Sequence, residues 1–487
     1  MKENYNESRR VFLKTTVTGF MYAALTESAL AKIVSKNKRM NVLFIAVDDL
    51  KPMLKAYGYK NIISPNIDKL AEEGVVFKNN QCQWPVCGAS RASILTGLMP
   101  ESTGVMGFQK IRKKHPDIVT MPQYFKENGY ETAAVGKVFD PRTVKSRRED
   151  DPLSWSIPYK PVHGSKYDKN RNNLSYMAPD VDVNELIDGQ ILQGGIKLMR
   201  QLAKQDKPFF LAVGFKKPHL PFIAPKKYWD LYDEDRIELA KYRKKAKNAC
   251  KYGWRKNKEI RKYSDVPDKG KISEDKQRKL IHGYYACVSY IDDLIGRLLA
   301  ELKKLKLDKN TIIVLWGDHG FHLGDHSLWA KHSDFEQATR APLIIYDPRS
   351  KNKGVSTESP TEFLDVFPTL CDLTGLEKPD NLEGKSLVPI LKNPKAEVRE
   401  GAITLFKHKG ALGYSLRTKR YRYILWIKRK TKKIAGEELY DYKTDPLETE
   451  NIAVYEKNKK LIRKLRTIML KEGKGCKLLK EAFESIE

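Results

Sequence analysis

The sequence predicts an α/β protein, with a mostly parallel sheet covered by helices on both faces and a smaller C-terminal subdomain built on an antiparallel sheet. Short apolar runs alternate with stretches of helical periodicity, as parallel strands joined by crossover helices do. Two of the apolar runs are followed by acidic residues, which would meet where the carboxyl ends of parallel strands share one sheet edge. Beyond about residue 395 the runs become short and closely spaced, which predicts the antiparallel part.

The elements follow in order along the chain. We expect parallel-sheet strands at residues 41–47, 132–135, 208–213, 311–316 and 342–346. Helices are expected from Ser64 to Ala71 with a stop at Gly74, at 121–128 before Gly129, at about 274–305 and at 362–373. The C-terminal strands are expected at 402–406, 413–417, 421–426 and 438–440, followed by a basic helix near 455–471.

The length of 487 residues exceeds one ordinary domain and predicts three parts. Residues 1–31 form an export signal, residues 32–395 the main domain and residues 396–487 the C-terminal subdomain. Within the main domain, residues 230–270 form a polar, basic insertion. Between Lys241 and Lys262 it carries eleven Lys and Arg against one acid, Glu259, with Tyr242, Tyr252 and Trp254 interleaved. Either it is a solvated surface insertion, or it is a ledge where aromatic faces stack on sugar rings and cations bind a polyanion.

The N-terminus predicts export. Residues 8–14 read SRRVFLK, a twin-arginine pattern, and are followed by a modestly apolar stretch at 15–25 and a small-residue cleavage site at 29–31. An ordinary amphipathic start is the alternative, which the order and spacing of the pattern disfavour. No other segment approaches the roughly 18–20 apolar residues of a membrane span. We therefore expect no stable membrane insertion, export by the twin-arginine machinery in the folded state, and a periplasmic or secreted protein.

The charge of +29 favours a polyanionic partner. Nucleic acid, sulfated polysaccharide and anionic membrane all satisfy the charge equally. Because the basic stretch has no recognisable nucleic-acid module and export is expected, nucleic acid is disfavoured. The six cysteines show no CxxC and no paired spacing, which excludes a disulfide scaffold and a structural zinc site.

The most specific motif is CGASRASILTG, from Cys87 to Gly97. It places Cys87 four residues before Arg91 and ends a short helical stretch in a Thr-Gly turn. This layout resembles the signature of the type I sulfatases, in which the cysteine is oxidised after translation to formylglycine (3-oxoalanine), whose hydrated aldehyde is the nucleophile. The usual motif has proline two residues after the cysteine, whereas this chain has Ala89.

Further blocks resemble the iduronate-2-sulfatase branch of that family over nearly the whole mature chain, in the same order and with similar spacing. They include NVLFIAVDDL, SPNIDKLAEEG, MPQYFKENGYETAAVGKVF, FFLAVGFKKPHLPF, GDHGFHLGDHSLWAKHSDFEQATRAPLIIY and ELYDYKTDPLETENIA. The resemblance implies an alkaline-phosphatase-like fold and the hydrolysis of sulfuric esters.

The acidic strand ends predict a metal site. Asp48-Asp49 and Asp318-His319 each follow an apolar run, and carboxylates suit a hard divalent cation that neutralises sulfate oxygens. The resemblance implies one Ca²⁺ bound by Asp48, Asp49, Asp318 and His319 and completed by modified Cys87. Because histidine is an unusual ligand for a hard ion, His319 would contribute mainly by orientation.

The resemblance also implies that Arg91, Lys137, His219 and Lys331 surround the sulfate. Arg91 would hold the nucleophile and a substrate oxygen, and a helix opening at Ser90 would aim backbone N–H groups at the sulfate. In the implied mechanism one hydroxyl of the hydrate attacks sulfur, while calcium and the lysines stabilise the developing charge. His219, with Lys331, protonates the departing sugar oxygen, and loss of a proton from the second hydroxyl expels sulfate and restores the aldehyde.

Three residues depart from the branch. Asp140 replaces a histidine after GKVF and could still act as a base, and Lys216 replaces a histidine and is expected to touch substrate. Ala89 replaces the proline that the copper-dependent aerobic maturase favours, whereas radical-SAM maturases accept alanine. We therefore expect a radical-SAM formylglycine-generating maturase as a partner, acting in the cytoplasm before export.

The expected substrate is a sulfated oligo- or polysaccharide, from a glycosaminoglycan or an alga. Two alternatives stay open. One is a phosphodiesterase or phosphonate monoesterase of the same superfamily, with His322, Asp325 and His326 as extra ligands for a second metal. The other is a non-catalytic polyanion-binding protein.

Overall fold

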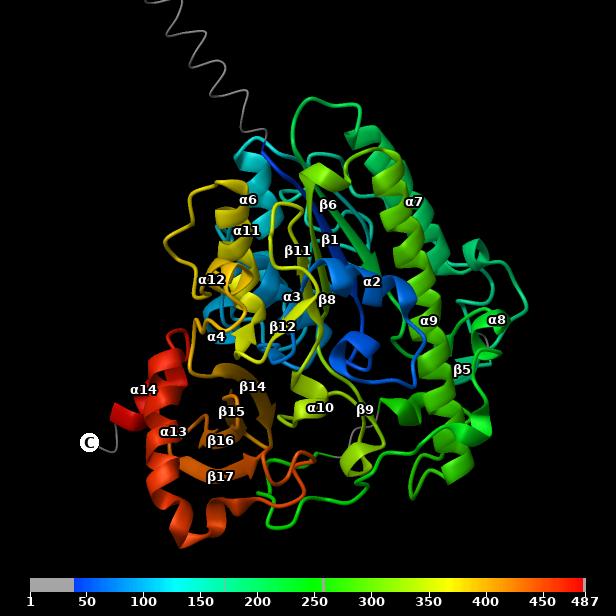
Figure 1. Cartoon of the computed structure of the whole chain (residues 1–487). Coiled ribbons are helices and arrows are strands. Elements are labelled where there is room, and N and C mark those ends of the chain that lie inside the picture. The colour runs from blue at the N-terminus through cyan, green and yellow to red at the C-terminus, as the bar shows by residue number, and fades with distance from the viewer. Residues whose placement is uncertain (1–38, 171, 256–258, 485–487) are drawn as a thin grey trace, which may run out of the picture. The chain divides into compact units, whose positions relative to one another are not determined.

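The computed structural model describes residues 39–170, 172–255 and 259–484. The predicted export signal at residues 1–31 lies outside the described residues. From Asn41 onward the described residues form one compact unit, built around the sheet in the middle of Figure 1.

The central sheet has seven strands in the order β12-β2-β11-β8-β1-β6-β4. The four strands β8, β1, β6 and β4 are parallel to one another, β11 is antiparallel to both of its neighbours, and β12 is parallel to β2. The strands are β1 Asn41–Val47, β2 Val75–Phe77, β4 Glu131–Gly136, β6 Phe209–Phe215, β8 Thr311–Gly317, β11 Leu343–Tyr346 and β12 Val355–Thr357. The predicted mostly parallel sheet is confirmed, and residues 342–346 form its antiparallel exception.

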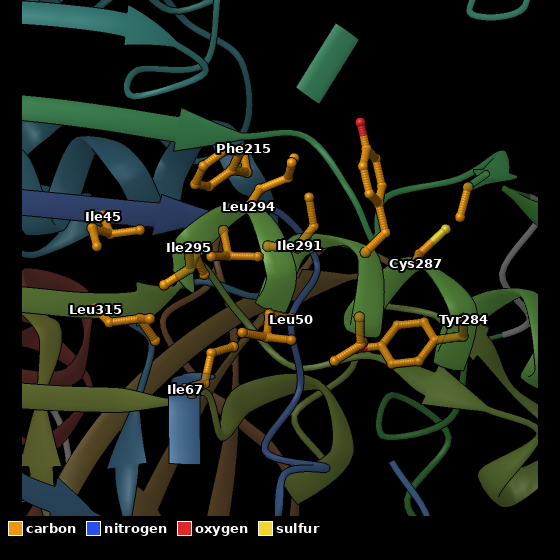
Figure 2. Packing of buried hydrophobic residues seen from close by; sticks show 14 of the residues in the cluster. Ile45, Leu50, Ile67, Phe215, Tyr284, Cys287, Ile291, Leu294, Ile295 and Leu315 are labelled. Carbon is orange, nitrogen blue, oxygen red and sulfur yellow. The ribbon is translucent and has the colours of Figure 1, made fainter. Parts of the chain in front are cut away.

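Helices cover both faces of the sheet, as predicted (Figure 1). Helices α2 (Pro65–Glu73), α7 (Ile187–Leu202) and α9 (Glu274–Lys304) pack on one face, and α3 (Cys87–Thr96), α6 (Met121–Glu127) and α11 (Val366–Thr374) on the other. Figure 2 shows Ile45 and Leu315 from the strands beside Ile291, Leu294 and Ile295 of α9.

Aromatic side chains from alternate positions of the same strands fill the opposite face. The Phe44 ring lies 5.3 Å from that of Trp316 and 5.7 Å from that of Phe210, and Phe125 of α6 lies 5.0 Å from Phe210. The alternation explains why each strand is apolar throughout, because both of its faces are buried.

The C-terminal sheet is antiparallel, as predicted, in the order β14 (Ala402–His408), β15 (Ala411–Arg417), β16 (Tyr421–Lys428) and β17 (Ile434–Asp441). Its strands are longer than the apolar runs, because hydrogen bonding continues into the polar residues beside each turn. Helices α13 (Lys459–Glu472) and α14 (Lys477–Glu484) follow.

Short elements connect these layers. They are the paired strands β3 (Asn80–Gln81) and β13 (Thr361–Glu362), β5 (Tyr176–Met177) and β7 (Phe222–Ile223), β9 (His322–Leu323) and β10 (Trp329–Ala330), and the helices α4 (Pro100–Thr103), α5 (Ile111–Lys114), α8 (Lys226–Trp229), α10 (Glu336–Thr339) and α12 (Val388–Lys392). Among the described residues, no helix combines the length and apolar character needed to cross a bilayer.

Candidate active site

Three buried carboxylates meet at the carboxyl edge of the parallel strands. Because Val47 of β1 is in register with Gly317 of β8, the residues that follow, Asp48, Asp49 and Asp318, come together. Asp49 has a positive φ of 60°, and its backbone N–H donates to the Asp318 carboxylate at 2.9 Å. One carboxylate oxygen from each of the three aspartates lies within 4.8 Å of the other two. Such a set of oxygen donors fits a hard divalent cation.

Arg91 joins two of these carboxylates from below. Its Nε donates to Asp318 at 2.9 Å and one Nη donates to Asp48 at 3.3 Å, while the other Nη donates to the carbonyls of Lys137 and Val138. The side chain is fully buried and lines neither of the two cavities described below, and its expected contact with a substrate oxygen stays a prediction. Arg91 fixes the orientation of the two aspartates.

Cys87 is the first residue of α3 and lies beside the carboxylates. Its Sγ is 3.3 Å from His319 Nε2 and 3.9 Å from an oxygen of Asp49. The expected helix opening at Ser90 is wrong, because α3 begins three residues earlier and the Ser90 N–H already donates to the Val86 carbonyl. His319 donates its Nδ1 proton to the Gly320 carbonyl at 2.9 Å, which turns Nε2 towards Cys87.

Two lysines supply positive charge at the same edge. Lys137 follows β4 and lies 2.5 Å from Asp48, and Lys331 lies 2.8 Å from both oxygens of Asp49. Burial disfavours the charged form of each lysine, but Asp48 and Asp49 outweigh it and raise the pKa of Lys137 and Lys331 respectively. Burial likewise opposes ionisation of Asp48, yet Lys137 and Arg91 hold its pKa well below the usual value. Lys137, Lys331 and Asp48 are therefore held in their charged forms, whereas burial raises the pKa of Asp318.

His219 lies in the loop after β6. Its Nδ1 donates to the Leu220 carbonyl at 2.5 Å, so Nε2 is turned to the site, 4.0 Å from Asp49 and 3.7 Å from Glu259. Burial lowers the pKa of His219 from its ordinary value, against the opposing effect of Asp49.

A cavity of about 750 Å³ opens above Cys87 and is rimmed by cations. Several of its lining residues were not anticipated from the sequence: Phe108, Arg142, Glu259, Tyr263, His332, His408 and Lys409. They come from loops and from β14, so no periodicity marks them. Glu259 carried one signal, as the single acid in the basic stretch, and it lies 3.2 Å from Lys331.

The basic insertion contributes to this cavity in part. Trp254, Arg255 and Lys262 line it. The other two aromatic residues contact other parts of the protein. Buried Tyr252 stacks on Trp426 at 5.8 Å, and partly buried Tyr242 contacts His326 at 5.4 Å. Only Trp254 of the three predicted aromatic residues is therefore placed to meet a ligand in this cavity.

A second cavity of about 680 Å³ lies on the other side of His219 and Arg142, which line both. It is lined by further cations, including Lys137, Lys216 and Arg148. The carboxyl edge of the sheet, with Cys87 and the three aspartates, thus lies between two cavities that are lined by cations.

Asp140 is not available as the base that the sequence suggested. Both of its oxygens accept from Arg142, at 2.8 and 2.7 Å, and Lys137 lies 3.6 Å away. Burial raises the pKa of Asp140, but Arg142 and Lys137 outweigh it and lower the pKa to about 2. The carboxylate therefore stays ionised and paired at neutral pH.

The alternative second metal site does not form in the described part of the chain. His322 Nε2 bonds to Ser333 at 2.8 Å, Asp325 pairs with Lys51 at 3.7 Å, and His326 stacks on Phe335. Among the described residues, the groups able to hold an ion all include Asp48 or Asp49.

The fold and the site define a class of protein, a hydrolase of anionic esters with the alkaline-phosphatase type of sheet. Comparisons with known proteins narrow this class. The sulfatase family model matches residues 40–376, and the model described as N-sulphoglucosamine sulphohydrolase, C-terminal, matches residues 324–474. The chain therefore belongs to the sulfatase family and is a sulfuric ester hydrolase.

Individual relatives agree with the family. The chain is 34% identical to iduronate 2-sulfatase of Mus musculus over 86% of this chain and 91% of that protein. It is also 34% identical to a sulfatase of Formosa agariphila, over 88% and 86%. In fold it is similar to a protein solved with its substrate D-glucosamine-2-N,6-O-disulfate, with a TM-score of 0.73, 22% identity and coverage of 91% of this chain and 99% of that one.

Proposed function

We propose that this chain is an exported, formylglycine-dependent and Ca²⁺-dependent sulfatase that removes sulfate from a sulfated saccharide. The substrate class is supported by relatives named iduronate 2-sulfatase and by a 29% identical ulvan-active sulfatase of Formosa agariphila. A glycosaminoglycan uronate 2-sulfate and an algal polysaccharide sulfate are the two leading substrates.

One observation carries the proposal. Cys87 stands at the start of α3, at the floor of a cation-rimmed cavity and beside three carboxylates. An anionic ester in that cavity would meet the nucleophilic position and the Lys331 ammonium group, while Asp48 and Lys137 line the adjoining second cavity.

Asp48, Asp49 and Asp318 would hold the ion, with His319 and modified Cys87 completing the site. When bound, Ca²⁺ supplies a Lewis acid that polarises the sulfate oxygens. Lys137 and Lys331 would add positive charge on either side of the sulfate, where charge develops in the transition state. Because His219 donates its Nδ1 proton to the Leu220 carbonyl, it would need a second proton on Nε2, as the imidazolium, to protonate the leaving sugar oxygen. Arg91 keeps Asp48 and Asp318 in place.

The function is tested by desulfation of defined saccharides, with aryl phosphate and phosphonate esters assayed in parallel and metal content measured. We expect sulfate release, at most weak phosphatase turnover, and one Ca²⁺ per chain. Two zinc ions per chain with dominant phosphoesterase activity would support the superfamily alternative instead. A Cys87→Ala protein that still released sulfate would disprove the nucleophile, and an unaltered chain that bound saccharide without turnover would be the non-catalytic alternative.

Maturation by a radical-SAM enzyme is part of the proposal and rests on Ala89. Mass spectrometry of the Cys87 peptide after co-expression with each type of maturase tests it. We expect conversion to formylglycine with the radical-SAM enzyme. Full conversion by the aerobic enzyme alone would contradict the proposal that Ala89 requires a radical-SAM maturase.

Export through the twin-arginine machinery, to the periplasm or medium, is proposed from the pattern at residues 8–14. Replacing Arg9 and Arg10 by lysine should retain the folded protein in the cytoplasm. Unchanged export of that variant would contradict the pathway.

A further inference from the structure

Arg142 is held in a fixed position where the two cavities meet. Its backbone N–H and Nε both donate to one oxygen of Asp140, at 3.0 and 2.8 Å, and one Nη donates to the other oxygen at 2.7 Å. The guanidinium lies 3.5 Å from the centre of the Phe108 ring. Among the described residues these are its only hydrogen bonds. The second Nη therefore remains for a ligand, and 46% of the side chain is exposed.

Residues 140–142 form an Asp-Pro-Arg turn, and the same sequence recurs at residues 347–349, away from both cavities. Arg349 donates to Asp347 through its backbone N–H, Nε and one Nη at 3.0, 2.9 and 2.8 Å, as Arg142 does to Asp140. However, that guanidinium also donates to the Leu373 carbonyl, and Arg349 lines neither of the two cavities. The Asp-Pro-Arg turn by itself therefore only fixes the arginine side chain. Arg142 differs from Arg349 because it lines a cavity, stacks on the Phe108 ring and keeps N–H donors that Asp140 does not use.

We propose that Arg142, held by Asp140 and Phe108, binds a second anionic group on the saccharide that carries the scissile sulfate and so selects polyanionic substrates. A guanidinium has five N–H donors, and Asp140 takes those on one edge, which leaves a second edge for a carboxylate or sulfate. Since Arg142 and Cys87 line the same cavity, one bound saccharide reaches both. The inference rests on the proposed sulfatase function and gives Asp140, whose role the sequence left open, the role of positioning Arg142.

The test compares three saccharides: a 2-O-sulfated uronate disaccharide, its carboxyl-reduced counterpart and the reduced form with one added sulfate. The unaltered chain should favour the two saccharides with a second anionic group over the carboxyl-reduced one. A larger preference for the uronate identifies that group as a carboxylate, and a larger preference for the form with the added sulfate identifies it as a sulfate. Arg142→Ala should lower the preference in kcat/KM about 10- to 100-fold, as expected for loss of a paired charged hydrogen bond. Arg142→Lys should lose most of it, because an ammonium lacks the fork.

Two further variants separate positioning from folding. Phe108→Leu and Asp140→Asn keep Arg142 but loosen it, and each should reduce the preference through KM more than through kcat. Arg349→Ala, the matched control, should leave the preference unchanged. Dissociation constants measured by calorimetry in a Cys87→Ala background give the same comparison without turnover.

The outcomes are distinct. Equal preference in the Arg142 variants and the unaltered chain, in both turnover and affinity, would overturn the inference while leaving the sulfatase function intact. Absence of sulfate release with Arg142-dependent affinity would overturn the function and support the binding site. Failure of the unaltered chain to distinguish the three saccharides would also overturn the inference.

Discussion

At the scale of single residues, the site depends on buried charges that hold one another. Arg91 spans Asp48 and Asp318 from beneath, so that a cation entering the site finds two carboxylates already oriented. A lysine at this position keeps the charge but loses the planar fork that spans both groups.

We therefore expect Arg91→Lys to weaken calcium affinity about 10- to 100-fold, the usual cost of losing a group that orients metal ligands. Calorimetric titration of calcium into metal-free protein measures this independently of turnover. Arg200→Lys is the matched control, because Arg200 also donates two hydrogen bonds to one carboxylate, Glu301, but is 55% exposed. Equal calcium affinity in both variants would contradict the orienting role.

A second residue, Asp188, connects the loop after β6, which carries His219, to helix α7. Asp188, in the first turn of α7, accepts from the Lys216 backbone N–H at 2.5 Å, and its other oxygen has no hydrogen-bond partner among the described residues. Burial raises the pKa of Asp188 to about 6, despite that hydrogen bond and the nearby Lys217. Relative to the unfolded chain, the folded state therefore favours the protonated carboxyl of Asp188.

The sign follows from linkage. Because the pKa of Asp188 is higher in the folded than in the unfolded chain, its stabilising contribution is fully present below pH 3.8 and is lost as the pH rises through about 6. Asp188→Asn keeps an oxygen acceptor without the charge. It should raise the free energy of unfolding at pH 8 by about 1–3 kcal/mol relative to the unaltered chain, and much less at pH 4.5. Urea unfolding at the two pH values measures this, and a gain independent of pH would contradict the assignment.

At the scale of elements, the start of α3 packs closely against the 107–108 segment. A Cβ at Gly88 would lie 2.3 Å from the Gly107 carbonyl oxygen and 2.8 Å from the Phe108 ring. The Gly107 backbone cannot yield without moving the floor of the cavity.

Gly88→Ala should therefore destabilise the protein by about 1–3 kcal/mol, the range for overpacking, and reduce sulfate release. Gly107→Ala, on the other side of the same contact, is the control, since its Cβ would meet only the end of the Gln109 side chain at 3.6 Å. Thermal unfolding and activity are compared after mass spectrometry has shown equal conversion of Cys87. Equal effects of the two substitutions would contradict the packing argument.

The sequence predicts elements well where one pattern dominates. The apolar runs located β1, β4, β6 and β8, and the acids behind β1 and β8 located the edge where the three carboxylates meet. Helix α7 was missed, because IDGQILQGGIKLMRQL contains three glycines that weaken the helical pattern, although two of them allow close packing on Val135 and Val213. The cavity walls were also missed, since Phe108, His332 and His408 become neighbours only through long-range packing.

At the scale of the whole molecule, a fully buried arginine is one of several links between the C-terminal sheet and the main domain. Arg422 of β16 donates to Glu336 at 2.5 Å and Thr339 at 3.0 Å, both in α10, and pairs with Glu448 at 2.9 Å. β14 also supplies His408 to the cavity, so the sheet contributes to the site as well as to stability. Loss of the arginine would leave buried Glu448 without its paired cation, whereas Glu336 would keep Arg417 at 3.1 Å.

Arg422→Ala should consequently lower the free energy of unfolding by about 3–5 kcal/mol, as breaking a buried ion pair does. Arg420→Ala, two residues earlier, should cost less than about 1 kcal/mol, because Arg420 pairs with Asp441 while 47% exposed. Denaturant unfolding followed by both circular dichroism and tryptophan fluorescence measures the two costs. If the sheet and the main domain unfold as one unit, the two signals shift together in Arg422→Ala. Separate transitions in the unaltered chain would show instead that the sheet is an independent folding unit that Arg422 only docks.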